Sequence, residues 1–176
     1  MFRKQLGVAF GMAIAMALTV ALFLYDPAWN LPDGIDGSPQ GRLALTALAW
    51  LGPLWALIVA IGVIANRRFF SPADIDGAGL STESPALRVP RAILANTHEQ
   101  ATLAALLYAG LAFTLPPERL ALPLLLSAAF VVGRIAFGRG YARGAGARAF
   151  GFGLTFYPTV GGAVVLVLRA LDHWRD

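Results

Sequence analysis

The sequence contains no cysteine and only two histidines, His98 and His173, among its 176 residues. A disulfide framework and a cysteine nucleophile are therefore excluded, and we expect no metal centre. Charge is also scarce, because 14% of the residues are charged and 57% are hydrophobic. Soluble domains carry about a quarter charged residues. The composition therefore indicates a membrane protein.

Five stretches with little or no charge are long enough to span a bilayer. They cover Leu6–Tyr25, residues 43–66, Arg91–Leu115, Leu120–Phe137 and Ala149–Leu168. Each approaches the ~20 residues that a helix needs to cross ~30 Å of hydrocarbon, and helices satisfy every backbone group internally. The first stretch is longer than a secretory signal and has no small-residue cleavage site after it. We expect an all-α integral membrane protein with five spans, the first of them uncleaved.

The basic residues predict an orientation. With the N-terminus in the cytoplasm, ten of the fourteen basic residues lie on the cytoplasmic side, as the positive-inside rule requires. The net charge of +4 is then explained by topology and lipid headgroups, and we expect no nucleic-acid partner. No lipidation or retention signal is recognisable, so we expect a prokaryotic inner membrane, with the C-terminus outside.

One carboxylate stands inside the third stretch. Glu99 is the only charged residue between Ala92 and Pro117, and Asn96 precedes it by one helical turn. A charge at membrane depth is costly, so such a residue is a candidate functional site, with arginines as its expected partners. The structural alternative is a buried pair with Arg134 or Asn96 that fixes the helix register.

A second informative segment connects the fourth and fifth stretches. Residues 133–148 contain four arginines, Arg134, Arg139, Arg143 and Arg148, together with Tyr141 and five glycines. Guanidinium groups bind carboxylates bidentately, and a cation lowers the pKa of a nearby thiol. This segment and the start of the third stretch, with Arg91, Asn96 and Glu99, are expected at the same membrane depth, where they would form an anion site. The alternative is that the arginines only set topology and bind lipid phosphates.

Two separated motifs in this order resemble the MAPEG family, the membrane-associated proteins of eicosanoid and glutathione metabolism. The first motif runs from Arg88 to Gln100, and the second comprises Gly133-Arg134, Phe137, Gly140-Tyr141 and Arg148-Ala-Phe-Gly-Phe. The resemblance covers roughly residues 43–171. It implies a four-helix membrane domain over residues 43–176, with residues 1–42 as an additional helix and outer loop.

The resemblance also implies a function and a set of roles. Family members are trimers that bind glutathione between subunits near the cytoplasmic face. By this comparison Asn96, Glu99, Arg134 and Tyr141 hold glutathione, and Arg148 stabilises its thiolate. Arg91 is expected to join the binding residues because it stands at the start of the third stretch. The resemblance thus implies a transferase or peroxidase that acts on lipophilic electrophiles, with glutathione as co-substrate and membrane lipids around a homotrimer.

The sequence departs from the family pattern at three positions. Ala92, Phe137 and Gln100 stand where relatives carry an arginine, a tyrosine and, in some members, another tyrosine. A second function class therefore stays open, namely a non-catalytic membrane protein that uses its arginines to bind lipid headgroups or a protein partner. A transporter is a weaker third class, because one glutamate in five helices offers little of a pathway.

Overall fold

The computed structural model describes residues 1–25, 31–77, 79–80 and 82–173. The elements are five long helices, α1 (Phe2–Leu24), α2 (Pro39–Phe69), α3 (Arg88–Thr114), α4 (Leu122–Tyr141) and α5 (Ala145–His173), and two short 3₁₀ helices, η1 (Pro85–Leu87) and η2 (Pro117–Arg119). No strand occurs among the described residues. The expected all-α architecture is confirmed.

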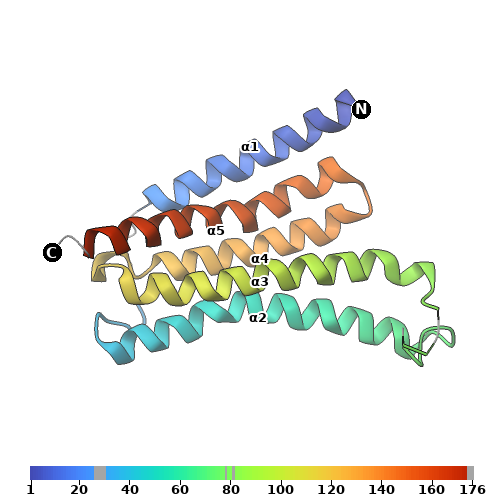
Figure 1. The fold of residues 1–176 in the computed structure, drawn as a ribbon, viewed down its shortest axis with the longest axis horizontal. Coiled ribbons are helices and arrows are strands. Elements are labelled where there is room, and N and C mark those ends of the chain that lie inside the picture. Colours follow the sequence, from blue (N-terminus) through green and yellow to red (C-terminus); the bar gives the residue numbers. More distant parts are fainter. Residues whose placement is uncertain (26–30, 78, 81, 174–176) are drawn as a thin grey trace.

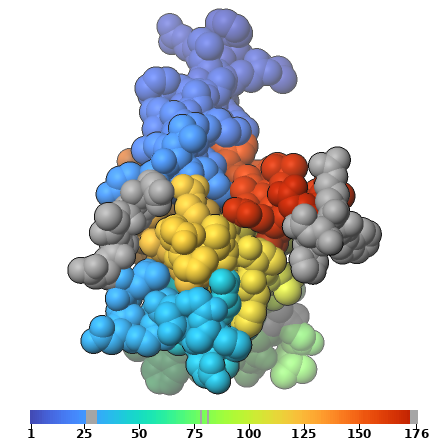
Figure 2. Space-filling view, turned by 90° about the vertical axis from the view of Figure 1, so that its left-hand side faces the viewer, coloured from blue at the N-terminus to red at the C-terminus, as the bar shows by residue number. Residues whose placement is uncertain are grey.

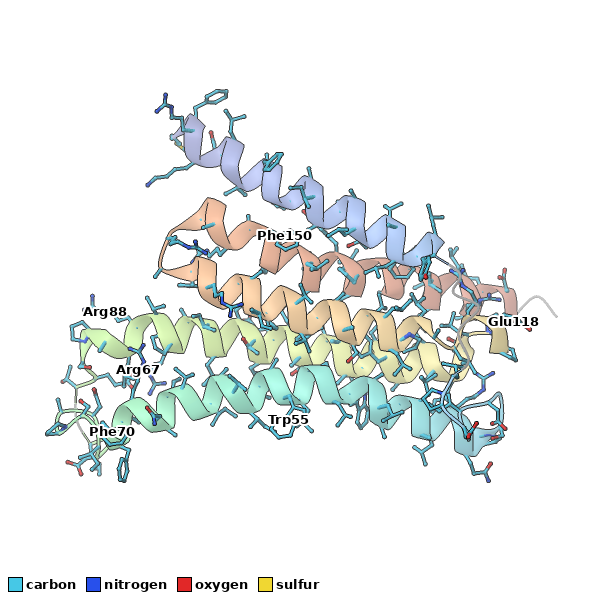
Figure 3. The ribbon with its side chains drawn as sticks, turned by 180° about the vertical axis from the view of Figure 1, so that it is seen from behind. Trp55, Arg67, Phe70, Arg88, Glu118 and Phe150 are labelled. Carbon is cyan, nitrogen blue, oxygen red and sulfur yellow. The ribbon has the colours of Figure 1, made fainter. Side chains whose placement is uncertain are left out.

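The long helices lie side by side in the order α2, α3, α4, α5, α1, with α1 diverging from the bundle towards its N-terminus (Figure 1). The N-terminus, the α2–α3 connection and the α4–α5 turn lie at one end, which we call the arginine-rich end (Figure 1). Arg67 and Arg88 lie at this end and Glu118 lies at the other (Figure 3). Both segments singled out from the sequence are therefore connected to the same end of the bundle.

Four helices, α1, α2, α4 and α5, are long and apolar enough to cross a membrane. The remaining predicted span, the third stretch, corresponds to α3, which is 27 residues long but is not in this group. Its first half concentrates polar residues, including Asn96, His98, Glu99 and Gln100. The chain is an integral membrane protein by this count, and α3 is its most polar long helix.

The main core lies where α2, α3 and α4 meet. Its largest fully buried side chains include Leu45, Tyr108, Leu111, Leu126 and Phe130. α1 reaches this core only near its C-terminal end, through Leu22 and Phe23, and it packs along α5, on the side of the molecule away from α2 (Figure 2). The contact is made through small residues: a Cβ atom at Gly11 would lie 2.9 Å from the backbone nitrogen of Phe150. Glycine at this position lets the two backbones approach closely.

Two of the arginines at the opposite end bind the carbonyl ends of helices. Arg42 Nη1 donates hydrogen bonds to the carbonyl oxygens of Ala112 and Leu115, at 2.7 and 2.9 Å. Arg119 Nη2 donates to the Phe23 carbonyl at 2.5 Å. The last carbonyls of a helix lack partners within the helix and carry partial negative charge. These arginines therefore have a structural role at the C-terminal ends of α3 and α1.

The α2–α3 connection is held by a buried carboxylate. Asp74 accepts hydrogen bonds from the Ser84 amide at 2.8 Å and from the hydroxyls of Ser71 and Ser84, both at 2.7 Å. The Ser84 amide and these hydroxyls lower the pKa of Asp74 below its ordinary value. Asp74 thus ties Ser71, just after α2, to Ser84, just before η1.

Candidate functional site

A chain of side-chain contacts links α4 to the surface of α3. Arg134 is only 7% exposed, and its Nη1 atom donates to Asn96 Oδ1 at 3.0 Å. Asn96 Nδ2 in turn donates to Glu99 Oε2 at 3.4 Å. The Arg134 guanidinium carbon also lies 4.1 Å from the centre of the Phe137 ring. Asn96 therefore stands between a buried cation and a carboxylate.

Glu99 itself is exposed on the single chain. Within the described part of the chain it forms no ion pair with an arginine, and Asn96 is the neighbour that it contacts. Of the structural alternative, a buried pair with Arg134 or Asn96, the contact with Asn96 is present, but it is not buried on the single chain. Asn96 and Glu99 are neighbours on α3, three residues apart, but Asn96 is partly buried whereas Glu99 is exposed.

The turn between α4 and α5 brings Tyr141 and Arg148 together. Gly144 has a φ of +106°, a conformation that suits glycine, and its amide donates to the Tyr141 carbonyl at 3.2 Å. At Gly140 a Cβ atom would collide with the Ala147 carbonyl, so the end of α4 and the start of α5 are in close contact. As a result the Arg148 guanidinium carbon lies 4.3 Å from the centre of the Tyr141 ring.

Asn96, Tyr141 and Arg148 border one cavity of about 370 Å³ between α1, α3, α4 and α5. This volume lies within the range of ~300–1,000 Å³ that is typical of small-molecule sites. The rest of its wall is apolar and consists of Val8, Met12, Phe137, Ala145, Ala149 and Phe152. The cavity thus combines one guanidinium, one phenol and one amide with an apolar wall, which is suited to a ligand that carries both charge and apolar groups.

The structure does not gather all the predicted arginines in one pocket. Arg134 and Arg139 border a different cavity, Arg143 is exposed, and Arg148 alone borders the cavity described above. The prediction of one pocket formed by all four is wrong for the single chain. Arg134 and Arg139 lie on α4 and border the same cavity, whereas Arg148 lies on α5, beyond the turn at Gly144.

Arg91 is also placed away from Asn96 and Glu99. Its guanidinium pairs with Glu83, which Arg68 also contacts at 2.8 Å. The hydrogen bond from Arg91, followed by that from Arg68, lowers the pKa of Glu83 and outweighs its desolvation. Within one chain Arg91 therefore braces the α2–α3 connection.

The motifs gave no indication of the part that α1 plays in the site. Val8 and Met12 come from α1 and form part of the wall of the cavity that Arg148 borders. Both are ordinary apolar residues, so no motif marks them. The only available signal is the spacing of Gly7, Gly11 and Ala15, which places small residues on one face of a helix.

A family model supplies the identification. The model of the MAPEG family matches residues 43–168, which is more than two thirds of the chain. The chain belongs to the MAPEG family. No curated protein and no solved structure matches the chain. Membership in the MAPEG family associates this membrane protein with glutathione-related or eicosanoid-related function. The matched region begins within α2 and ends within α5, so α1 lies outside it.

Two of the three departures from the MAPEG pattern lie in the interior. Phe137 is 4% exposed, and its ring lies next to both Arg134 and Tyr141, 5.3 Å from the Tyr141 ring centre. Gln100 is buried, and its Oε1 atom has no hydrogen-bond partner among the described residues. Phe137 has no hydroxyl, and its ring packs against the Arg134 guanidinium. The cavity therefore keeps one phenol, that of Tyr141.

Proposed function

We propose that this MAPEG protein is a glutathione-dependent membrane transferase or peroxidase that acts on lipophilic electrophiles. The observation that carries the proposal is the cavity in which Arg148 stacks on Tyr141, beside Asn96 and an apolar wall. Glutathione is a small peptide with two carboxylates and a thiol. A guanidinium, a phenol and an amide suit its polar groups, whereas Val8, Met12 and Phe152 suit an apolar co-substrate.

In the proposed reaction Arg148 favours the thiolate over the thiol, because a cation stabilises the developing negative charge on sulfur. In a transfer reaction the sulfur forms a bond to an electrophilic carbon. The leaving group departs with the bonding electron pair, and the thiol proton is released to water. In a peroxidase reaction two thiols reduce a hydroperoxide to an alcohol and water, and the two sulfurs become a disulfide. Asn96, Glu99, Arg134 and Tyr141 are proposed to bind glutathione, and Arg91 to join them only from another subunit or after rearrangement.

The exposed position of Glu99 supports a homotrimer as part of the proposal. A carboxylate at membrane depth needs a polar partner, and on the single chain the contact that it makes is with Asn96. A neighbouring copy packed on this face of α3 would cover Glu99 and could complete the glutathione site.

Glutathione binding to the detergent-purified protein, measured by calorimetry, is the first test. We expect saturable binding that Glu99→Gln weakens, together with an ultraviolet thiolate signal that Arg148→Ala removes. Absence of binding at millimolar glutathione would refute the enzyme proposal. It would favour the non-catalytic alternative, in which the arginines bind lipid headgroups or a protein partner. The absence of a hydroxyl at Phe137 supports this alternative.

A further inference from the structure

A second and larger cavity lies between α2, η1, α3 and α4. Its volume is about 850 Å³, and three arginines border it, namely Arg67, Arg134 and Arg139. Thr97 is the other polar residue in its wall, and no aspartate or glutamate is among the lining residues. The wall is otherwise apolar, so the cavity has a strong positive charge without a compensating carboxylate.

The arginines retain donors for a ligand. Arg134 uses Nη1 for Asn96, while its Nε and Nη2 atoms are buried without a hydrogen-bond partner among the described residues. Arg67 Nη1 donates to the Ala86 carbonyl at 3.1 Å, which holds its side chain across the space between α2 and η1. Arg67 and Arg139 are exposed, whereas Arg134 is buried, and a buried cation without a counter-charge is costly. The cavity therefore favours an anion.

The shape of the cavity defines the kind of anion. On α2 its wall extends from Trp55, near the middle of the helix, to Arg67, near its end (Figure 3). Twelve residues of helix span about 18 Å. One leaflet contributes half of the ~30 Å hydrocarbon core, so the cavity is about as long as one leaflet is thick. A further apolar cavity of about 350 Å³ shares Trp55 and Val131 with it and continues between α2 and α4 to Leu48. Positive charge near the membrane surface is thus joined to an apolar groove that leads inwards.

We propose that this cavity binds an anionic phospholipid from the leaflet at the arginine-rich end. Arg67 and Arg139 bind the phosphate, Arg134 adds its charge from the wall, and an acyl chain lies in the α2–α4 groove. Guanidinium groups match phosphate oxygens bidentately, and basic pockets between transmembrane helices suit anionic headgroups. Arg134 takes part in both proposals, but the inference goes beyond the proposed glutathione reaction, because Arg67 and Arg139, which bind the phosphate, do not border the cavity of Arg148.

Native mass spectrometry of protein released from vesicles of phosphatidylcholine and phosphatidylglycerol tests whether the cavity selects an anionic headgroup. We expect the wild-type protein to retain phosphatidylglycerol in preference. The double variant Arg67→Gln/Arg139→Gln should bind it about 25-fold more weakly, because each arginine near a membrane surface contributes roughly fivefold. The control is Arg88→Gln/Arg143→Gln, which removes two exposed arginines that do not border the cavity. An equal loss in both double variants, or equal retention of the two phospholipids by the wild type, would overturn the proposal.

The location is tested by filling the cavity. Gly138 borders it, and a Cβ atom there meets nothing within 4 Å, so Gly138→Leu is expected to fold and to occupy the space of the acyl chain. Gly62→Leu on α2 is the matched control, because Gly62 is equally unobstructed and lies outside the wall. We expect Gly138→Leu to lose the bound phospholipid and Gly62→Leu to keep it, with thermal unfolding confirming that both are folded. Retention by Gly138→Leu, or retention of a free fatty acid in place of the phospholipid, would contradict the inference.

Discussion

Asn96 connects two opposite charges through a single amide, since its oxygen accepts from Arg134 and its nitrogen donates to Glu99. Replacing it with alanine leaves Arg134 buried with one more unpaired donor. A hydrogen bond to a charged group contributes ~1.5–3 kcal/mol, so we expect Asn96→Ala to lower the free energy of unfolding by about 2 kcal/mol. Unfolding in mixed micelles measures this. Thr102→Ala is the control, because Thr102 is exposed on the same helix and bonds only the carbonyl of His98. Equal stability of the two variants would mean that Asn96 does not hold Arg134.

Arg148 is stacked on Tyr141 at the wall of the smaller cavity. If it stabilises the reacting sulfur, Arg148→Ala should lower kcat by about 10²–10³-fold, the usual effect of removing one group that stabilises developing negative charge. Arg148→Lys should restore part of the activity, because it keeps the charge and loses the planar group. Steady-state kinetics with glutathione and a hydrophobic aryl halide would measure both. Full activity in Arg148→Ala would exclude the proposed role.

The candidate residues could be predicted from the sequence because charged side chains are unusual within or beside membrane helices. A carboxylate at Glu99 and a dense run of arginines stand out against apolar neighbours, so both segments could be identified without a structure. The division of the arginines was not predictable, because it depends on which side of α4 each residue faces and on the turn at Gly144. The pairing of Arg91 with Glu83 was equally hidden, since it depends on the folding of the α2–α3 connection.

At the scale of the elements, α1 docks on α5 by backbone approach at Gly11. A leucine there cannot fit against the Phe150 nitrogen, so Gly11→Leu should separate α1 from α5 near the site. The chain contains no cysteine, which allows Gly7→Cys/Gly146→Cys to report docking directly, because a Cβ atom at Gly7 would lie 3.7 Å from the Gly146 Cα. We expect this pair to form a disulfide, and Gly11→Leu to prevent it.

The control for this experiment is Ala13→Leu on the exposed side of α1, which should leave the cross-link intact. Efficient cross-linking in the Gly11→Leu variant would show that close backbone contact is unnecessary for docking. Since Val8 and Met12 form part of the cavity wall, loss of docking should also raise KM for a lipophilic substrate more than KM for glutathione.

The connection between α2 and α3 should respond to acid through Asp74. Its pKa is lowered in the folded protein from the ordinary value of 3.8, so its contribution is present above pH 3.8 and is lost as the pH falls through the lower folded value. Pepsin cleavage between Ser71 and Ser84 should therefore increase in that acid range. Asp74→Asn should be cleaved at higher pH as well, whereas Asp76→Asn, exposed in the same segment, should behave like the wild type. Cleavage of Asp74→Asn no faster than wild type would refute the role of these hydrogen bonds.

The helices themselves were largely predictable, because hydrocarbon thickness and backbone hydrogen bonding leave few alternatives to long apolar helices. Each helix is longer than its predicted span, for example Ala145–His173 against Ala149–Leu168, although α4 begins at Leu122, two residues later than predicted. The lateral order of the helices was not predictable from apolar stretches. It depends on close contacts such as Gly133 against Thr155 and Gly11 against Phe150, which place α4 and α1 on either side of α5.

At the scale of the whole molecule, α3 leaves an unusual surface uncovered. Glu99, Leu106 and Phe113 follow one another at intervals of seven residues, so they share one face of the helix, and all three are exposed. A spacing of seven is the one by which helices pack against each other. Leu106 and Phe113 would tolerate lipid, whereas Glu99 would not. This face is therefore the expected contact between copies of the chain in the proposed homotrimer.

A cross-linking experiment tests this arrangement, because any disulfide in a single-cysteine variant must join two copies of a chain that has no other cysteine. We expect Leu106→Cys, oxidised in the membrane, to give a covalent dimer on a denaturing gel, and the native mass in mild detergent to equal three chains of 18.6 kDa. Oxidation after dissociation in dodecyl sulfate should give no dimer and serves as the control. A Glu99→Cys variant should resist maleimide from water until the subunits are separated. A monomeric native mass, with rapid labelling at position 99, would mean that Glu99 is exposed in the native protein as well, and a glutathione site shared between copies would then be excluded.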